Sequence, residues 1–159
     1  MSYELYLQDR KLGNELFEIV HEAAKEFNAS VIAPNTIRTI EGGLLSYQSD
    51  FGREHNPYTI GLDRLVDVDQ DIDFIGKEAL KKIKEDGISE KLVGVEIDGD
   101  PIQKAPENFW PVFDVNSNKI GRLSRCFYSP RLKKNIGLAI IDIKFTEPGT
   151  PLVIESPKA

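Results

Sequence analysis

The sequence of 159 residues contains few of the residues on which several classes of protein depend. Its single cysteine, Cys126, excludes an internal disulfide and a cysteine-based zinc cluster. The two histidines, His21 and His55, lie 34 positions apart, which disfavours a histidine-rich metal site. No apolar run approaches the roughly 18 residues of a membrane span, and the N-terminus lacks the basic and apolar regions of a signal peptide. These absences predict a cytoplasmic globular protein.

Three motifs of common enzyme classes are also absent from the sequence. They are the Gly-x-x-x-x-Gly-Lys phosphate loop, the Gly-x-Ser-x-Gly nucleophile elbow and the Gly-x-Gly-x-x-Gly dinucleotide fingerprint. The sequence therefore gives no local support for NTP hydrolysis, esterase chemistry or dinucleotide binding.

The charges that are present divide unevenly along the chain. The net charge of −6 comes from 20 Lys and Arg against 26 Asp and Glu. Residues 1–80 hold 7 basic and 15 acidic residues, whereas residues 81–159 hold 13 and 11. Because the secondary-structure signals change at the same place, the sequence favours two units over one.

The first half predicts mainly helices. Alternation indicates a strand at 3–7, and apolar spacing of three and four residues predicts an amphipathic helix at 14–27 with Asn14 as its N-cap. Pro34 is expected to open a short helix that Gly42 and Gly43 end, and an irregular loop follows over 44–57. A second clear helix is predicted at 76–86, with Gly87 as its stop.

The second half predicts strands and turns only. Five short strands are expected, at 92–97, 111–115, 119–123, 136–143 and 152–155. Five strands in about 70 residues are typical of a small antiparallel barrel or sandwich. The predicted fold class is therefore α+β, with the boundary near residues 87–90.

Several residue groups could carry chemistry, and for each a structural explanation is favoured. The aspartates at 63, 67, 69, 71 and 73 lack the glycine and terminal glutamate of an EF-hand loop, so a solvated loop is expected. His55 could shuttle protons but is expected to be solvated, and Trp110 beside Phe109 is expected in the core. A basic group could bind phosphate or contact the acidic first half of the chain, but the favoured interpretation is that it forms a charged surface of the barrel. The group consists of Arg122, Arg125, Arg131, Lys133 and Lys134.

Two segments have residue patterns more specific than a generic loop requires. The first runs from Glu41 through Gly43, Leu44 and Tyr47 to Asp50, and the second is the Ser-Pro-x-Leu-Lys-Lys-Asn turn of residues 129–135. Between and after them come Gly-Leu at 61–62, Phe-Ile-Gly-Lys-x-Ala-Leu at 74–80, Lys-Leu-Val-Gly at 91–94 and Pro-Gly at 148–149. In this order they resemble the glycine cleavage T-protein (aminomethyltransferase) family of tetrahydrofolate-dependent enzymes, which includes dimethylsulfoniopropionate demethylase.

The resemblance implies both a fold and a site. It implies that residues 1–87 are the C-terminal part of a folate-binding α+β domain and that residues 88–159 form a C-terminal antiparallel β-barrel domain. Tyr3 and Glu4 match a Gly-Tyr-Glu strand in which the family's glutamate contacts the folate, although Ser2 replaces the glycine. A carboxylate suits this task because it can accept both adjacent N–H donors of a pterin. Tyr3 and Glu4 are therefore the predicted cofactor-binding residues, with tetrahydrofolate as the cofactor.

The same resemblance implies that parts of the enzyme are missing. A full member is more than twice this length and has an N-terminal portion with a catalytic aspartate, so the chain alone is expected to be inactive. An arginine of the aminomethyltransferases is replaced here by Asn35, and whether Arg38 substitutes for it stays open, since three residues rotate a side chain by about 300°. This departure and the short C-terminus shift the expected substrate toward the demethylase branch.

Three functional hypotheses follow. The first is part of a folate-dependent C1 transferase that moves a methyl or aminomethyl carbon from a small donor to tetrahydrofolate. The second is a non-catalytic binding or assembly module that pairs with a separate N-terminal half or with itself, since half a domain exposes apolar surface. The third, a nucleic-acid binder, is disfavoured because such modules are usually strongly basic. No nucleic-acid or membrane partner is expected.

Overall fold

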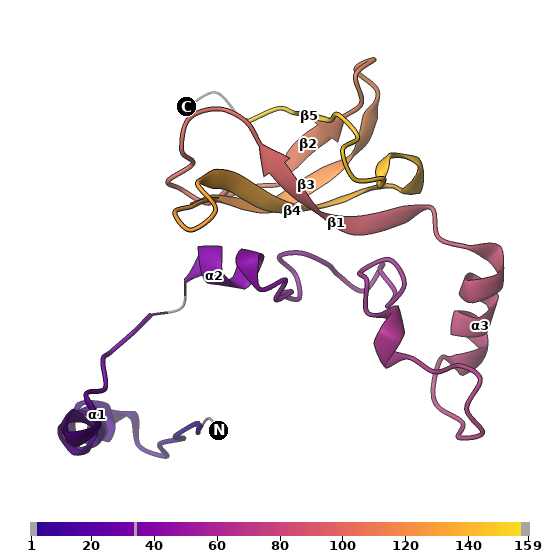
Figure 1. Cartoon of the computed structure of the whole chain (residues 1–159). Helices are drawn as coiled ribbons and strands as arrows, with labels where there is room; N and C mark the ends of the chain where they lie inside the picture. Colours follow the sequence, from indigo (N-terminus) through magenta and orange to yellow (C-terminus); the bar gives the residue numbers. More distant parts are fainter. Residues whose placement is uncertain (1–2, 34, 157–159) are drawn as a thin grey trace. The chain divides into compact units, whose positions relative to one another are not determined.

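The computed structural model describes residues 3–33 and 35–156, and in it the chain divides into two compact units. The first unit is Met1–Pro34 and the second is Asn35–Ala159. Figure 1 shows the helices and strands of both, and each unit is considered by itself.

The first unit contains one amphipathic helix. A 3-10 turn, η1 (Arg10–Leu12), leads into α1 (Gly13–Ala24) and then into a second 3-10 turn, η2 (Lys25–Phe27). The predicted helix is thus confirmed, but Asn14 is not its N-cap, because α1 already begins at Gly13 and Leu12 occupies the N-cap position. Asp9 caps the preceding turn η1 by accepting from the Lys11 amide at 2.9 Å. None of the residues of α1 is buried.

The strand predicted at 3–7 is wrong, because these residues are irregular in the structure. A strand persists only when a neighbouring strand takes up its backbone hydrogen bonds. No described strand pairs with this segment, so its alternating pattern alone does not make it extended sheet.

The second unit is built on a five-stranded antiparallel sheet in the order β1-β4-β3-β2-β5. The strands are β1 (Glu90–Ile97), β2 (Trp110–Phe113), β3 (Lys119–Ser129), β4 (Lys134–Asp142) and β5 (Val153–Ile154). All five predicted strands are present, and the sheet curls into a half-barrel (Figure 1). The short 3-10 turn η4 (Ile143–Phe145) follows β4.

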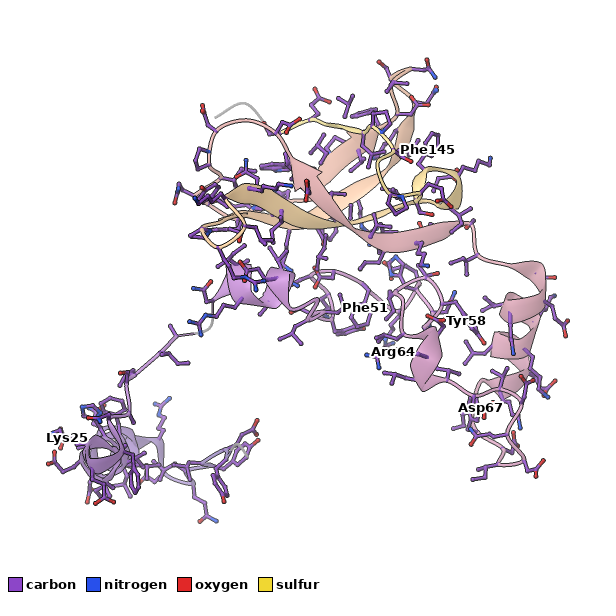
Figure 2. The ribbon with its side chains drawn as sticks, viewed as in Figure 1. Lys25, Phe51, Tyr58, Arg64, Asp67 and Phe145 are labelled. Atoms are coloured by element: carbon purple, nitrogen blue, oxygen red, sulfur yellow. The ribbon has the colours of Figure 1, made fainter. Side chains whose placement is uncertain are left out.

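The core lies on the inner face of this curled sheet. Its fully buried members come from the three middle strands and are Val112, Leu123, Cys126, Ala139 and Ile141. Partly buried side chains pack against them, among them Trp110, as predicted, and Phe145, which Figure 2 labels. Gly121 and Gly137 permit close strand contact, because a Cβ on Gly121 would overlap the backbone of Ile140 and Ile141.

The outer face of the sheet is also covered. Residues alternate between the faces of a strand, so Leu138 and Ile140 of β4, both buried, point away from the core cluster. Here α2 (Thr36–Glu41) contacts β3 and β4. We call residues 35–60 the strap, because this segment begins at α2 and reaches the edge strand β1. There the Leu92 amide donates to the Thr59 carbonyl at 2.7 Å.

The remaining helix of this unit, α3 (Lys77–Asp86), begins after Gly76 and ends at Gly87, as predicted. The 3-10 turn η3 (Asp63–Leu65) precedes it. Leu80 and Ile83 are half-buried, but Ala79, expected to face inward, is exposed. Among the helices that the structure describes, none is long and apolar enough to cross a membrane.

Candidate functional site

The predicted folate-binding residues lie in the irregular segment before α1. Tyr3 and Glu4 are exposed, and the Tyr6 hydroxyl donates to the Glu4 carboxylate. This hydrogen bond to a carboxylate raises the pKa of Tyr6. The structure therefore brings a second aromatic residue to Glu4, and the folate-binding role of Tyr3 and Glu4 stays a prediction.

Asn35, for which the resemblance implies an arginine, has a local structural task. Its side-chain oxygen accepts from the Ile37 amide at 3.0 Å and so caps the N-terminus of α2. Arg38 follows on the same helix and is exposed. Pro34, expected to open this helix, lies outside the described residues.

The strap is fastened to the sheet by a buried carboxylate. Asp50 is fully buried and forms a two-point contact with the guanidinium of Arg125 on β3, at 2.8 Å from Nε and 2.6 Å from Nη2. The Ser124 hydroxyl and the Ser46 amide also donate to Asp50, at 2.9 and 2.7 Å. Arg125 donates in addition to Thr39 Oγ1 and the Leu44 carbonyl, each at 2.8 Å.

The register of β3 makes this cluster possible. Neighbouring residues of a regular strand point to opposite faces, yet Ser124 and Arg125 both reach Asp50. The pairing of β3 with β4 shifts between Leu123 and Arg125, as in a β-bulge. Such an irregularity re-aims a side chain and so brings both donors to one carboxylate.

A second carboxylate holds the end of α2 to the turn between β3 and β4. The Ser129 hydroxyl donates to Glu41 Oε1 at 2.5 Å, and Arg131 Nε lies 3.1 Å from Oε2. Ser129 is buried and also accepts from the Leu132 amide at 3.0 Å. The two sequence motifs at 41–50 and 129–135 are therefore joined by the contacts of Glu41 with Ser129 and Arg131.

His55 lies in a third polar cluster, between the strap and two strands. Its side chain is 1% exposed, so the expectation of a solvated histidine is wrong. Nδ1 accepts from the Gly52 amide at 3.0 Å, while Nε2 lies 3.5 Å from Arg122 Nη2 and 3.6 Å from Glu90 Oε1. Arg122 also stacks over the ring of Phe109, at 4.7 Å from its centre.

The basic group therefore has a different role from the one favoured from sequence. Three of its arginines face acidic residues of the strap: Arg122 meets Glu54 at 3.6 Å, Arg125 meets Asp50, and Arg131 meets Glu41. Lys134 pairs with Glu96 at 2.7 Å. The alternative in which this group meets the acidic first half is the one that these contacts support.

Among the aspartates between residues 63 and 73, Asp69 pairs with a lysine of α3. Lys84 Nζ lies 2.7 Å from Asp69, which lowers the pKa of Asp69 and raises that of Lys84. Figure 2 shows Asp67 at this end of the unit, and the Lys77 ammonium donates to the carbonyls of Gln70 and Ile72. In the part of the chain that the structure describes, no three His, Cys, Asp or Glu side chains are placed to hold a metal.

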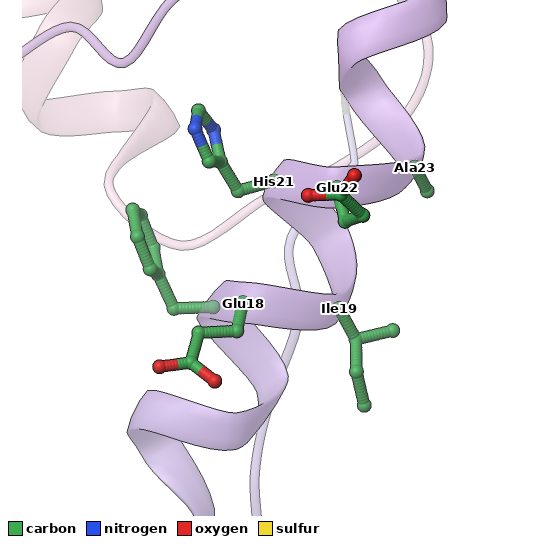
Figure 3. Close-up of a pocket in the computed structure, with 6 residues that line it drawn as sticks. Glu18, Ile19, His21, Glu22 and Ala23 are labelled. Carbon is green, nitrogen blue, oxygen red and sulfur yellow. The ribbon is translucent and has the colours of Figure 1, made fainter.

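A shallow hollow lies on α1 (Figure 3). The rings of Phe17 and His21 stack in it at 5.6 Å, and every residue that lines it belongs to this helix. It is a surface feature of one helix and not an enclosed ligand cavity.

Sequence reasoning missed Asp50, Arg125 and Ser124 as one cluster. Asp50 ended the motif of residues 41–50, and Arg125 belonged to the basic group. The charge asymmetry between the two halves was the available signal, since it suggested contact between acidic and basic segments. The bulge in β3 that brings Ser124 and Arg125 to the same carboxylate had no signal in the sequence.

Comparison with known proteins gives a consistent result. The glycine cleavage T-protein C-terminal barrel domain matches residues 90–159. The chain is 30% identical over 158 residues to dimethylsulfoniopropionate demethylase of Ruegeria pomeroyi, covering 98% of this chain and 42% of that protein. It is 38% identical over 158 residues to an aminomethyltransferase of Geobacillus sp., covering 97% of this chain and 42% of that protein.

A solved structure shares the fold. The crystal structure of glycine cleavage system aminomethyltransferase T from Bartonella henselae superposes with a TM-score of 0.64 at 21% identity, over 74% of this chain and 32% of that one. The chain spans about two-fifths of the length of the two curated relatives it matches.

Proposed function

The chain belongs to the glycine cleavage T-protein (aminomethyltransferase) family, as predicted, and from this premise we propose that it is the C-terminal portion of a tetrahydrofolate-dependent C1 transferase. The parent enzyme would move a methyl or aminomethyl carbon from a small donor to a nitrogen of tetrahydrofolate. Such chemistry depends on holding the folate nitrogen against an activated carbon in a cleft that excludes water. The compartment we propose is the cytoplasm.

One observation carries this proposal. Similarity to proteins named as a dimethylsulfoniopropionate demethylase and an aminomethyltransferase extends over 97–98% of the chain, so it includes the residues before the barrel domain as well as the domain itself. We therefore keep the division into a folate-domain portion, residues 1–87, and a barrel domain, residues 88–159, as part of the proposal. The contacts of Glu41 and Asp50 support a role for the strap in joining these portions.

Within this portion, Glu4 is the proposed folate ligand, with Tyr3 beside it. Its carboxylate would accept hydrogen bonds from the pterin, and Tyr6, which already donates to Glu4, would have to share it or turn away. No catalytic residue is proposed in this chain, so we expect no turnover from the chain alone.

The carbon donor is either a dimethylsulfoniopropionate-like or a glycine-derived compound. Similarity extends to both a demethylase and an aminomethyltransferase, with 30% and 38% identity. Asn35 supports the demethylase side, because a residue that caps α2 supplies no charge for a donor carboxylate.

The experiment that tests the proposal is reconstitution with the missing portion. The chain is mixed with the separately expressed N-terminal portion of the Geobacillus aminomethyltransferase, and tetrahydrofolate-dependent carbon transfer is measured with each donor. Activity of the mixture but not of either part is expected, and Glu4→Gln should lower it at least tenfold whereas Glu15→Gln, an exposed carboxylate on α1, should not. Transfer by the chain alone would contradict the proposal.

The second candidate function, a non-catalytic assembly module, is favoured by the apolar side chains that α1 leaves exposed. It predicts that the two portions associate in analytical ultracentrifugation but transfer no carbon. Association with activity would exclude it.

A further inference from the structure

The cluster around His55 has a use that the proposed function does not require. His55 is nearly fully buried, and charged groups from three elements face its ring: Glu54 of the strap, Glu90 of β1 and Arg122 of β3. Nδ1 lies 3.4 Å from Glu54 Oε1 and 3.0 Å from the Gly52 amide nitrogen. The two ring nitrogens therefore meet different kinds of partner.

The Gly52 contact determines where the proton of the neutral ring lies. A backbone N–H can only donate, so Nδ1 must be the acceptor and the ring proton must be on Nε2. From there the N–H faces Glu90 Oε1 at 3.6 Å. Arg122 Nη2 lies 3.5 Å from Nε2, and because both nitrogens then carry hydrogen they cannot hydrogen-bond to each other. The acceptor for Arg122 Nη2 is instead Glu54 Oε1, at 3.6 Å.

The same contact closes a short ring of hydrogen bonds in the strap. The Gly52 amide donates to Nδ1 of His55, and the His55 amide donates back to the Gly52 carbonyl at 3.2 Å. The Glu54 carboxylate lies directly over Gly52, where a Cβ on that glycine would overlap it. In the turn of residues 52–55, the Gly52 amide, its acceptor His55 Nδ1 and the Glu54 carboxylate therefore lie close together.

Protonation cannot leave this arrangement intact. A proton added to Nδ1 would point at the Gly52 N–H across 3.0 Å, which places two donors together. An acceptor is available in Glu54 Oε1, 3.4 Å from Nδ1, and Glu54 remains ionised because a hydrogen bond from its own backbone amide, with help from His55 and Arg122, lowers the pKa of Glu54. The proton comes from solvent, and the N–H bond at Nδ1 is the one covalent bond that forms.

We propose that His55 is a proton-operated switch in the strap: on protonation, Nδ1 releases the Gly52 amide and donates to Glu54 instead. The switch lies five residues after Asp50 and beside the strand residues Glu90 and Arg122, so it acts where the strap meets the sheet. Proton uptake would change the conformation of residues 52–55 while the Asp50 contact to Arg125 stays in place.

The test is an NMR titration of the full chain between pH 8 and pH 5.5. The Gly52 amide and the Glu54 carboxyl carbon should shift together with the ring of His55 and share its midpoint. Any change at the ring of His21, which stacks on Phe17 in α1, should leave both signals unmoved. A Gly52 amide that stays still while the His55 ring titrates would overturn the switch, as would a His55 ring that does not titrate in this range.

His55→Asn supplies the decisive variant. An asparagine can still accept from the Gly52 amide but cannot be protonated, so the Gly52 and Glu54 signals should lose their pH dependence. His21→Asn is the matched control and should leave both titrations unchanged. Retained pH dependence in His55→Asn overturns the proposal; if that variant does not fold, the coincidence of the three midpoints in the unaltered chain decides.

Discussion

The two units of the chain use their apolar residues in opposite ways. In the unit of residues 35–159, five side chains form a fully buried cluster inside a curled sheet, and the ion pair of Asp50 with Arg125 fastens the strap outside it. In the unit of residues 1–34, α1 has an apolar face of the usual kind, but none of its residues is buried. Phe17 and Phe27 are 54% and 76% exposed.

This difference shows that family similarity and self-sufficient folding are separate properties. The similarity to relatives covers both units, yet among the residues that the structure describes the buried core cluster belongs to the second unit. An amphipathic helix gains most of its stability by burying its apolar face. The proposed folate residues Tyr3 and Glu4 lie in the first unit, in the irregular segment before α1.

Among the substitutions that test this difference between the units, Arg125→Ala should cause the largest loss of stability. The substitution leaves Asp50 fully buried without its ion-pair partner, and we expect a loss of about 3–5 kcal/mol in the free energy of unfolding. Urea denaturation followed by circular dichroism measures it. The control is Arg131→Ala, whose side chain is 70% exposed, with an expected loss below about 1 kcal/mol. Equal losses for the two variants would show that the strap is not fastened through Asp50.

A second test compares apolar truncations in the two units. Leu123→Ala removes a fully buried core side chain and should cost about 2–5 kcal/mol. Phe17→Ala, on the exposed face of α1, should change stability by less than about 0.5 kcal/mol. The same denaturation experiment measures both. A large loss for Phe17→Ala would mean that α1 is covered in solution and would break the comparison.

The sequence predicted the elements that depend on local patterns better than the features that depend on distant residues. The five strands and the helix at 76–86 were predictable because their periodicity or their Gly stops act locally. The strand at 3–7 was not, because a strand depends on a partner that the local pattern does not reveal. The fastening of Asp50 and the burial of His55 bring together residues 67 to 75 positions apart, and the sequence marked the segment of Asp50 as unusual without indicating its partner.

Two glycines give a third test, with effects of opposite sign. A Cβ at Gly121 would overlap the backbone of β4, so Gly121→Ala should destabilise the sheet by about 1–3 kcal/mol. Gly13 opens α1 with a helical φ of −58° and open space around it, so Gly13→Ala should stabilise the helix by about 0.5–1 kcal/mol. Thermal unfolding monitors the first and helical ellipticity the second. A destabilising Gly13→Ala would indicate a hidden contact on α1.

The smallest expected effect concerns the carboxylate that closes the β2–β3 turn. Asp114 accepts from the side chain of Asn118 at 2.9 Å and from the amides of Asn118 and Asn116 at 2.8 and 2.9 Å, which lowers its pKa below the ordinary value of about 3.9. Its contribution to stability is therefore fully present above about pH 4–5 and is lost as the pH falls through the folded pKa.

Asp114→Asn should consequently lower the urea midpoint of the sheet at pH 7, and the difference from the unaltered chain should shrink toward pH 3. Asp9→Asn is the matched control, because Asp9 also accepts from a backbone amide but caps η1 in the unit without a core. Since no buried residue depends on that turn, its midpoint should equal that of the unaltered chain at every pH. A pH-independent effect of Asp114→Asn would mean that the turn is held by its backbone hydrogen bonds and not by the charge.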